Sequence, residues 1–222
     1  MPTTTFLHLP AEKRERFTTA ALDEFAIHDY RTASVGRIAR TAGIAKGSVY
    51  QYFDGKQDLY LYLVTLAAER KFGFIDGSLP ADAGSFFERF RLTVFHGARF
   101  DFTHPRLASL LYNATYEPSG PETRAVSAQL KAASQRYVRG LVDAGIRSGD
   151  LRADLDVDFA VFALYQLSVS LRDYLSERFA FSFADAVRRG GGSPVPDDDL
   201  LAVLGALVDV LERGLATPRS AP

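Results

Sequence analysis

The stretch from Ser34 to Lys56 constrains the fold more than any other part of the chain. It reads SVGRIARTAGIAKGSVYQYFDGK, with apolar residues at positions 35, 38, 39 and 42, which is the spacing of one helix face. Ser34 precedes that face and is a good helix cap, because its hydroxyl accepts from the first free amides. Gly43 follows it, where a left-handed backbone ends a helix at little steric cost. The stretch therefore predicts two short helices joined by a tight turn.

The second of these helices is expected from about Lys46 to Tyr52, and it has few apolar positions. Val49 and Phe53 are its anchors, while most of its other residues are hydrogen-bond donors or acceptors. In a helix-turn-helix protein the second helix presents its side chains to the major groove of DNA. A short helix that is polar around two apolar anchors fits that role.

The polar side chains of this second helix divide into two chemical groups. Ser48 and Gln51 are expected near base edges, because a hydroxyl and an amide read donor and acceptor patterns. Lys46, Tyr50 and Tyr52 are better suited to phosphates, which position a protein on DNA without encoding sequence. The alternative is that Tyr50 and Tyr52 are partly buried core aromatics.

Two more basic residues lie beside the helix pair. Arg37 is in the first turn of the first helix and is a better candidate for DNA than Arg40, which we expect to be a solvated charge. Lys56 is in the first turn of the helix that follows Phe53, where free amides and the helix dipole favour an anion. A DNA phosphate at that position is physically coherent.

The same residues carry a resemblance to a known family. The pattern IA…AG…KGSVYQYF…K…DL resembles the DNA-binding domain of the TetR (tetracycline-repressor-like) transcriptional regulators, over roughly residues 10–70. The turn glycine, the apolar spacing, the Tyr-x-Tyr-Phe run and the following lysine all agree. One position departs: the family usually has Ser or Thr where this chain has Ala45. A hydroxyl that would cap the second helix or reach a phosphate is therefore missing.

The resemblance supports the positions of the second helix and Lys56 as DNA-facing, and it is less informative about Gln51. Taken together with the residue chemistry, it gives one set of candidate DNA-binding residues. They are Ser34, Arg37, Lys46, Gly47, Ser48, Tyr50, Gln51, Tyr52 and Lys56.

The composition bounds the class of protein. Hydrophobic residues make up 47% of the 222 positions, which is enough for a full core. The chain has no cysteine, so it has no disulfide framework and no thiolate metal site. It shows neither a signal peptide nor an apolar run near the ~18 residues of a membrane span. We therefore expect no membrane contact and a cytoplasmic location.

The net charge of −1 does not by itself indicate a DNA-binding protein. Residues 1–74 carry ten basic and eight acidic side chains, so the N-terminal part is only slightly basic. The local placement is more informative, because Lys46 and Lys56 lie beside hydroxyls at helix starts.

Helical periodicity continues to the C-terminus, and no strand-like alternation occurs, which predicts an all-α protein of about nine helices. Residues 1–74 are expected to form a three-helix helix-turn-helix domain together with the start of a linking helix. The segment Phe74–Gly84 breaks the pattern, so the domain boundary is placed there. Residues 75–222 are expected to form a larger helical domain for ligand binding and dimerisation.

The last predicted helix, Asp198 to Leu215, is apolar over too much of its circumference for a simple surface helix. Such a face usually marks a partner, so we expect this helix and the preceding one, Val157 to Phe179, to pair with their copies in a homodimer. The resemblance to TetR regulators implies the same four-helix interface. The alternative is a helix that is central to the core of a single chain. The candidate interface residues are Leu200, Leu204, Leu207, Val208 and Leu211.

The C-terminal domain is rich in aromatic residues, and a few polar residues lie among them. Ligand pockets are mostly apolar with a few oriented polar groups, so a small hydrophobic or aromatic effector is expected. An anionic end on the effector is favoured if Arg99 or Arg172 points inward. The candidate ligand-binding residues are His96, Arg99, Asn113, Tyr137, Tyr165, Gln166 and Arg172.

No pattern in the sequence supports an enzyme. There is no Gly-rich phosphate loop after a strand, no HExxH and no G-x-S-x-G, and the four histidines lack ligand spacing. We therefore assign no catalytic residue, metal or cofactor. The chain is expected to be a ligand-responsive transcriptional regulator, most simply a repressor that an effector releases from a palindromic operator in double-stranded DNA. The alternative is a helical ligand-binding dimer with weak or lost DNA binding.

Overall fold

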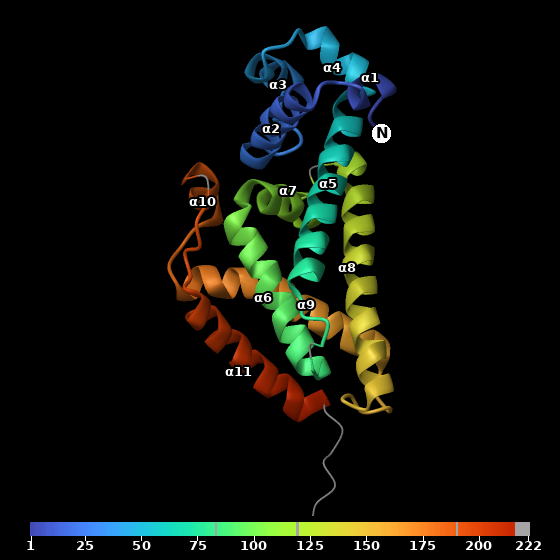
Figure 1. The fold of residues 1–222 in the computed structure, drawn as a ribbon, viewed down its shortest axis with the longest axis vertical. Coiled ribbons are helices and arrows are strands. Elements are labelled where there is room, and N and C mark those ends of the chain that lie inside the picture. The colour runs from blue at the N-terminus through green and yellow to red at the C-terminus, as the bar shows by residue number, and fades with distance from the viewer. Residues whose placement is uncertain (83, 119, 190, 216–222) are drawn as a thin grey trace, which may run out of the picture. The chain divides into compact units, whose positions relative to one another are not determined.

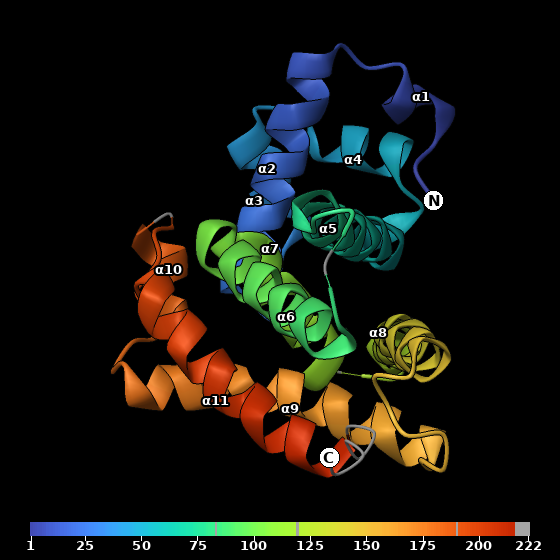
Figure 2. The same ribbon diagram turned by 60° about the horizontal axis from the view of Figure 1, so that its bottom comes forward.

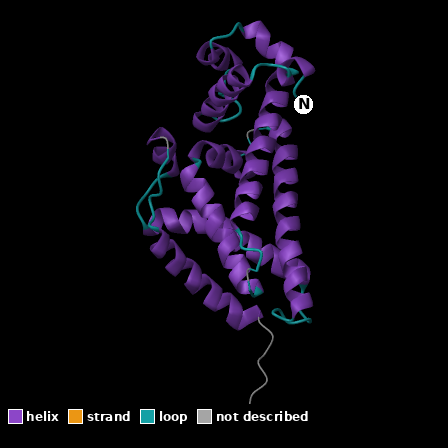
Figure 3. Cartoon of the chain, viewed as in Figure 1, coloured by secondary structure: helices purple, strands orange, loops and turns teal. Residues whose placement is uncertain are grey.

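The structure is a computed structural model that describes residues 1–82, 84–118, 120–189 and 191–215. All of its regular elements within these ranges are α-helices, and no strand occurs among them (Figure 3). The all-α prediction is therefore confirmed. The helices are α1 (Thr4–Leu7), α2 (Ala11–Ile27), α3 (Val35–Ala42), α4 (Lys46–Tyr52), α5 (Gly55–Ser78), α6 (Phe86–Thr103), α7 (Pro105–Tyr116), α8 (Pro121–Ser148), α9 (Val157–Arg178), α10 (Phe183–Arg189) and α11 (Asp197–Leu215).

Two short helices, α1 and α10, were not among the roughly nine that the sequence predicts. Helix α1 has four residues, which are too few to show a helical period, and α10 has seven. Helix α5 also runs to Ser78, past the break expected at Phe74. It continues because Ile75 is buried and the Phe74 ring lies 5.7 Å from that of Phe100.

The chain divides into two compact units, each assembled from several segments. The first comprises Met1–Lys71, His104–Leu130 and Phe183–Gly191, and the second comprises Phe72–Thr103, Lys131–Ser182 and Gly192–Pro222. Helices α5 and α8 contribute residues to both units. The domain boundary placed between residues 74 and 75 stays a prediction.

Helices α1, α2, α4 and the start of α5 lie together in the first unit (Figures 1 and 2). An aromatic cluster forms the core between them. Phe6, Phe17 and Phe53 are all at most 2% exposed, and their ring centroids lie 4.9–5.9 Å apart. Such pairs add specific geometry to the burial of apolar area. Val49 and Phe53, the two anchors expected from the sequence, are both buried in this core.

Helix α7 packs on α2 within the same unit. Arg106 Nε lies 2.5 Å from Asp23 Oδ1, and Ser109 Oγ donates to the Ala26 carbonyl at 3.1 Å. The first unit therefore extends the three-helix head with a helix from the middle of the chain.

Helix α11 packs against α6 in the second unit. Leu200, Leu204 and Leu211, three of the candidate dimer residues, are buried within the single chain, with exposed fractions of 0%, 0% and 8%. Leu207 and Val208 are only partly covered. The stripe that the sequence singles out thus faces the core of the chain over much of its length, and the outward face of α11 is a different one, which includes Val210.

Candidate nucleic-acid interface

The turn between α3 and α4 has the caps that the sequence predicts. Ser34 is the N-cap of α3, and its Oγ accepts from the Arg37 amide at 3.4 Å. Gly43 ends the helix with φ 67° and ψ 36°, a left-handed conformation that costs a glycine little. The end of α3 is also tied to α2, because Arg16 Nε donates to the Ala42 carbonyl at 3.0 Å. The end of α3 that leads into the turn is therefore held by Gly43 and by α2.

Helix α4 presents a polar face to solvent. Lys46, Gly47 and Gln51 are exposed, Tyr50 is 54% exposed, and Ser48 is partly covered. Val49, on the opposite side, is 1% exposed. This distribution is what a helix needs if it is to offer side chains to a groove while remaining anchored in a core.

Tyr50 and Tyr52 have different surroundings. Tyr50 points away from the core, whereas the Tyr52 ring lies 5.8 Å from Phe6 and 5.6 Å from Phe17. Of the two alternatives for these residues, the partly buried aromatic describes Tyr52 and the exposed side chain describes Tyr50.

Ala45 is the N-cap of α4 and makes no side-chain cap hydrogen bond. The missing hydroxyl noted in the sequence thus leaves the start of α4 without the side-chain acceptor that Ser34 supplies to α3.

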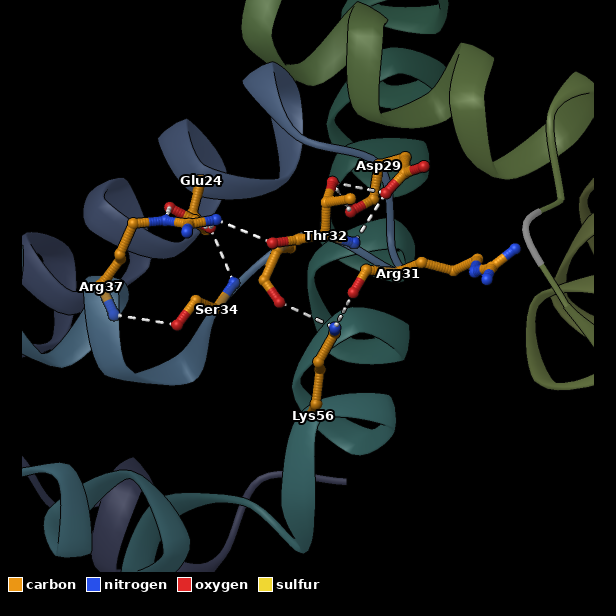
Figure 4. A network of polar contacts seen from close by, with 8 residues as sticks. Glu24, Asp29, Arg31, Thr32, Ser34, Arg37 and Lys56 are labelled. Carbon is orange, nitrogen blue, oxygen red and sulfur yellow. Dashed lines mark hydrogen bonds and ion pairs between the residues drawn. The ribbon is translucent and has the colours of Figure 1, made fainter.

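A buried carboxylate organises the polar side of this head (Figure 4). Glu24 on α2 is 8% exposed, and its Oε1 accepts from the Ser34 amide at 2.7 Å. Arg37 binds the same carboxylate through Nε at 2.9 and 3.0 Å and through Nη2 at 2.5 Å. Arg37 Nη2 also donates to the Thr32 carbonyl at 2.8 Å. The guanidinium predicted to contact DNA is therefore engaged inside the chain.

Lys56 is likewise engaged with the loop between α2 and α3. Its Nζ donates to the carbonyls of Ala33 at 2.7 Å and Arg31 at 3.2 Å (Figure 4). The same Nζ lies 4.8 Å from the centroid of the Tyr30 ring. Asp29 closes the same loop, because its Oδ1 accepts from the Thr32 amide at 2.7 Å and from the Thr32 hydroxyl at 2.6 Å. The loop is thus held from within and from α5.

The pKa directions follow from these contacts. Burial alone would raise the pKa of Glu24, but the hydrogen bonds from Arg37 and Ser34 outweigh it and lower the pKa. Burial lowers the pKa of Lys56, against the opposing charges of Asp29 and Glu24. The hydrogen bonds from Thr32 lower the pKa of Asp29.

Sequence reasoning missed Glu24 and the Asp29–Thr32 loop. The signal for the loop was present, since an Asp three residues before a Thr is a common local turn. The Glu24–Arg37 pair joins residues 13 positions apart on different helices, so no local pattern reveals it.

The seven candidate ligand-binding residues do not all lie in one unit. Asn113 is on α7 in the first unit, and the other six are in the second. Arg99 is ion-paired with Asp197, Tyr165 is buried, Gln166 is exposed, and His96 and Arg172 are partly covered. Whether they share a ligand stays a prediction.

Two of these residues have shifted pKa values. Burial, followed by the hydrogen bond to Asp76 at 3.0 Å, raises the pKa of Tyr137 to about 12. Burial, followed by the charge of Arg99, lowers the pKa of His96. Both side chains therefore favour the neutral form near pH 7.

A groove of about 380 Å³ lies between α8 and α9 in the second unit. It contains none of the seven predicted ligand residues. It is lined by Ala132, Gln135, Arg136, Arg139, Asp158, Val161 and Phe162. Arg139 is ion-paired with Asp158 across it, so the groove has a polar rim beside apolar residues.

Within the described ranges, no group of His, Cys, Asp or Glu side chains is placed to hold a metal ion. Among the same residues, no helix is both long enough and apolar enough to cross a membrane.

A capped turn followed by a short helix with an outward polar face, mounted on a three-helix head, defines the class of helix-turn-helix DNA-binding proteins. Comparison with known families gives the family. The model of the family "Bacterial regulatory proteins, tetR family" matches residues 17–63. The model of the family "Tetracyclin repressor-like, C-terminal domain" matches residues 85–216. The chain belongs to the TetR family and is a DNA-binding transcriptional regulator, as the resemblance implied.

Three known proteins illustrate the relationship. The crystal structure of a TetR family transcriptional regulator from Chloroflexus aurantiacus J-10-FL is 41% identical, with a TM-score of 0.78, and the match covers 98% of this chain and 100% of that one. The HTH-type transcriptional repressor KstR2 of Rhodococcus jostii is 25% identical over 94% of this chain and 93% of its own. FadR of Bacillus subtilis, solved in complex with stearoyl-CoA, shares the fold at 21% identity and a TM-score of 0.66, over 90% of this chain and 98% of its own.

Proposed function

We propose that this protein is a ligand-responsive repressor that binds a palindromic operator as a homodimer and leaves it when a hydrophobic effector binds. The observation that carries the DNA-binding part is the outward polar face of α4, on a head in which the caps of α3, the loop between α2 and α3 and the aromatic core are all held by contacts within the chain. A preorganised reading helix binds without first being ordered, which lowers the cost of association.

The proposed contacts to DNA come from the exposed part of α4. Ser48 and Gln51 are assigned to base edges, and Lys46 and Tyr50 to phosphates, with Gly47 leaving room for the backbone to approach. The remaining candidates, Ser34, Arg37, Tyr52 and Lys56, make contacts inside the head. We assign them to positioning the helix pair.

The proposed dimer interface is the exposed apolar face of α9 with the outward side of α11. Phe159, Phe162 and Tyr174 are 66%, 51% and 48% exposed, and they fall on one face of α9. Val210 on α11 is 68% exposed. A second copy of the chain is the proposed occupant, because a short recognition helix contacts few bases and two heads are needed for useful specificity.

The proposed effector is a small molecule with a large apolar part. Helix α6 alone buries Phe86, Phe87, Phe90, Phe95, Phe100 and Phe102, so the core of the second unit is rich in aromatic carbon. FadR of Bacillus subtilis, which shares the fold, was solved with stearoyl-CoA, a ligand with a long hydrocarbon chain. Mass spectrometry of small molecules that co-purify with the protein identifies the effector directly.

Release of DNA is proposed to act through α5, which contributes residues to both units. A ligand changes an equilibrium only by the difference between its affinities for two states. The effector must therefore favour the dimer conformation in which the spacing of the two α4 helices no longer matches successive major grooves.

Footprinting on the DNA beside the protein's own coding sequence tests the proposal. The expected result is protection of two half-sites about one helical turn apart. Gln51→Ala is expected to change the preferred bases while the spacing of the half-sites stays the same, and Arg40→Ala serves as the matched surface control. A Gln51→Ala variant that selects the same sequences as the parent would overturn the base-reading assignment.

The second candidate is a ligand-binding dimer without DNA binding. The lack of a side-chain cap at Ala45 favours it, because an uncapped short helix is less stable. Absence of any footprint at about 50 mM salt, where phosphate contacts are strongest, would favour this candidate.

A further inference from the structure

Helix α4 is too short to be stable by itself. It has seven residues, and isolated helices shorter than ~12–15 residues are marginal in water. Its N-cap, Ala45, makes no side-chain hydrogen bond. The head must therefore hold this helix in some other way if the side chains at positions 46–51 are to keep one orientation.

The N-terminal segment supplies hydrogen bonds at the opposite end of α4. The Thr3 amide donates to the Tyr52 carbonyl at 2.9 Å, and the Thr3 hydroxyl donates to the Gln51 carbonyl at 2.7 Å. These carbonyls belong to the last turn of α4, whose oxygens have no partner within the helix. Two of the free acceptors at the end of the recognition helix are thus satisfied by one residue that lies 48 and 49 positions away.

Apolar packing anchors the same segment. Thr3 is also the N-cap of α1, since its Oγ1 accepts from the Phe6 amide at 3.4 Å. Phe6 is fully buried, and its ring lies 4.9 Å from Phe53 and 5.8 Å from Tyr52. Figure 2 shows α1 beside α4. The Phe6 side chain therefore packs against Tyr52 and Phe53. Thr3 binds the last two carbonyls of α4 with its amide and its hydroxyl.

We infer that residues Thr3–Leu7 form a brace that holds the recognition helix in place of the cap missing at Ala45, and that Thr3 is its positioning residue. Thr3 does not touch DNA in this account. The inference rests on the proposed DNA-binding function, but its first readout, the order of α4 in the free protein, does not depend on DNA.

Amide hydrogen exchange of residues 49–53 in the full chain tests the brace. Thr3→Val removes the hydroxyl and keeps the shape, so exchange in α4 is expected to be about three- to tenfold faster, which corresponds to one hydrogen bond. Thr3→Ser keeps the hydroxyl and is expected to behave as the parent. Thr5→Val is the matched control, because Thr5 is exposed on the same helix. Unchanged exchange in Thr3→Val would overturn the inference.

A rescue experiment links the two ends of α4. Ala45→Ser introduces a cap whose worth is similar to that of one hydrogen bond, so it is expected to restore slow exchange in the Thr3→Val background. Operator affinity is expected to fall in Thr3→Val and recover in the double variant, with the salt dependence unchanged because no phosphate contact is lost. Failure of Ala45→Ser to slow exchange would contradict the idea that the brace replaces the cap.

The two proposals fail in different ways. If the exchange results are as expected while the parent protein binds no operator fragment, the brace is supported and the proposed DNA-binding function is overturned. If the parent binds DNA and Thr3→Val changes neither exchange nor affinity, the brace is overturned and the proposed function is unaffected.

Discussion

Glu24 is the residue to which the polar contacts of the head converge. Its carboxylate holds the start of α3 through the Ser34 amide and orients Arg37, so it links α2 to the helix pair. Such a buried acceptor is costly when its partners are lost.

Glu24→Gln is expected to lower the free energy of unfolding by about 1–2 kcal/mol, the size typical of breaking a buried hydrogen-bonded group. The expected loss of unfolding free energy is small for a buried carboxylate, because the Arg37 side chain is 45% exposed and solvent screens the ion pair. Chemical denaturation at pH 7 measures the change. Glu12→Gln, at an exposed position on the same helix, is the control.

The pH dependence of this difference has a defined sign. Because the pKa of Glu24 is lower in the folded chain than the ordinary glutamate value of about 4.5, its contribution is fully present above about pH 4.5. It is lost as the pH falls through the folded-state pKa. The stabilities of the parent and Glu24→Gln should therefore converge as the pH falls below 4.5, and a difference that does not shrink in acid would contradict the assignment.

Substitutions of Lys46 and Lys56 are expected to change the salt dependence of DNA binding in different ways. Lys46→Met removes a proposed phosphate contact from each head, so the slope of log K against log salt should flatten by about 0.9 per contact, or nearly 2 for a dimer. Lys56→Met loosens the loop that its Nζ holds, so affinity should fall with the slope unchanged. Fluorescence anisotropy at several salt concentrations distinguishes them, and equal flattening in both variants would show that Lys56 reaches phosphate.

At the scale of the elements, sequence patterns predict those helices and caps that depend on interactions between residues close together in the chain. The spacing of Ile38, Ala39 and Ala42, the cap at Ser34 and the left-handed Gly43 were all readable, because each depends on neighbours within a few residues. The type and approximate span of the other eight helices that the sequence predicts follow in the same way. Helix α1 was missed because its stability comes from contacts with residues about 50 positions away, such as those of Thr3 with Gln51 and Tyr52.

The candidate site was predicted less completely than the fold. Exposure of Lys46, Tyr50 and Gln51 follows from the anchors at Val49 and Phe53, which fix the orientation of α4. The contacts of Lys56 are with backbone carbonyls, which carry no sequence signal. The predicted phosphate at Lys56 stays a prediction, while in the free chain its Nζ binds carbonyl oxygens.

Gly145 marks a close approach between α8, Phe86 and Leu151. A Cβ there would lie 2.9 Å from Phe86 Cδ2 and 3.0 Å from Leu151 side-chain atoms. Gly145→Ala is therefore expected to destabilise the second unit by about 1–3 kcal/mol through overpacking. Gly140→Ala, on the same helix with nothing within 4 Å, is expected to stabilise by about 0.5–1 kcal/mol. Thermal denaturation of both variants measures the contrast, and equal effects would contradict the packing account.

At the scale of the whole molecule, the proposed function depends on two copies acting together. Phe162→Asp places a charge on the proposed dimer face, so it should shift the protein to monomers in analytical ultracentrifugation. Operator affinity should then fall by about 100-fold or more, because the two half-sites are no longer bound by one linked pair. Ile27→Asp, at another exposed apolar residue, is the control and should remain dimeric. A dimeric Phe162→Asp would place the interface elsewhere.

The central claim is that a dimer binds operator DNA through α4 and that an effector weakens this binding. A fluorescence anisotropy titration of the operator, with and without the co-purifying small molecule, tests it most directly. We predict saturation at two chains per operator, loss of binding in Tyr50→Ala combined with Gln51→Ala, and at least a tenfold weaker affinity with the effector present. Equal affinity for the operator in the presence and absence of the molecule, or binding that survives in the double variant, would contradict the account.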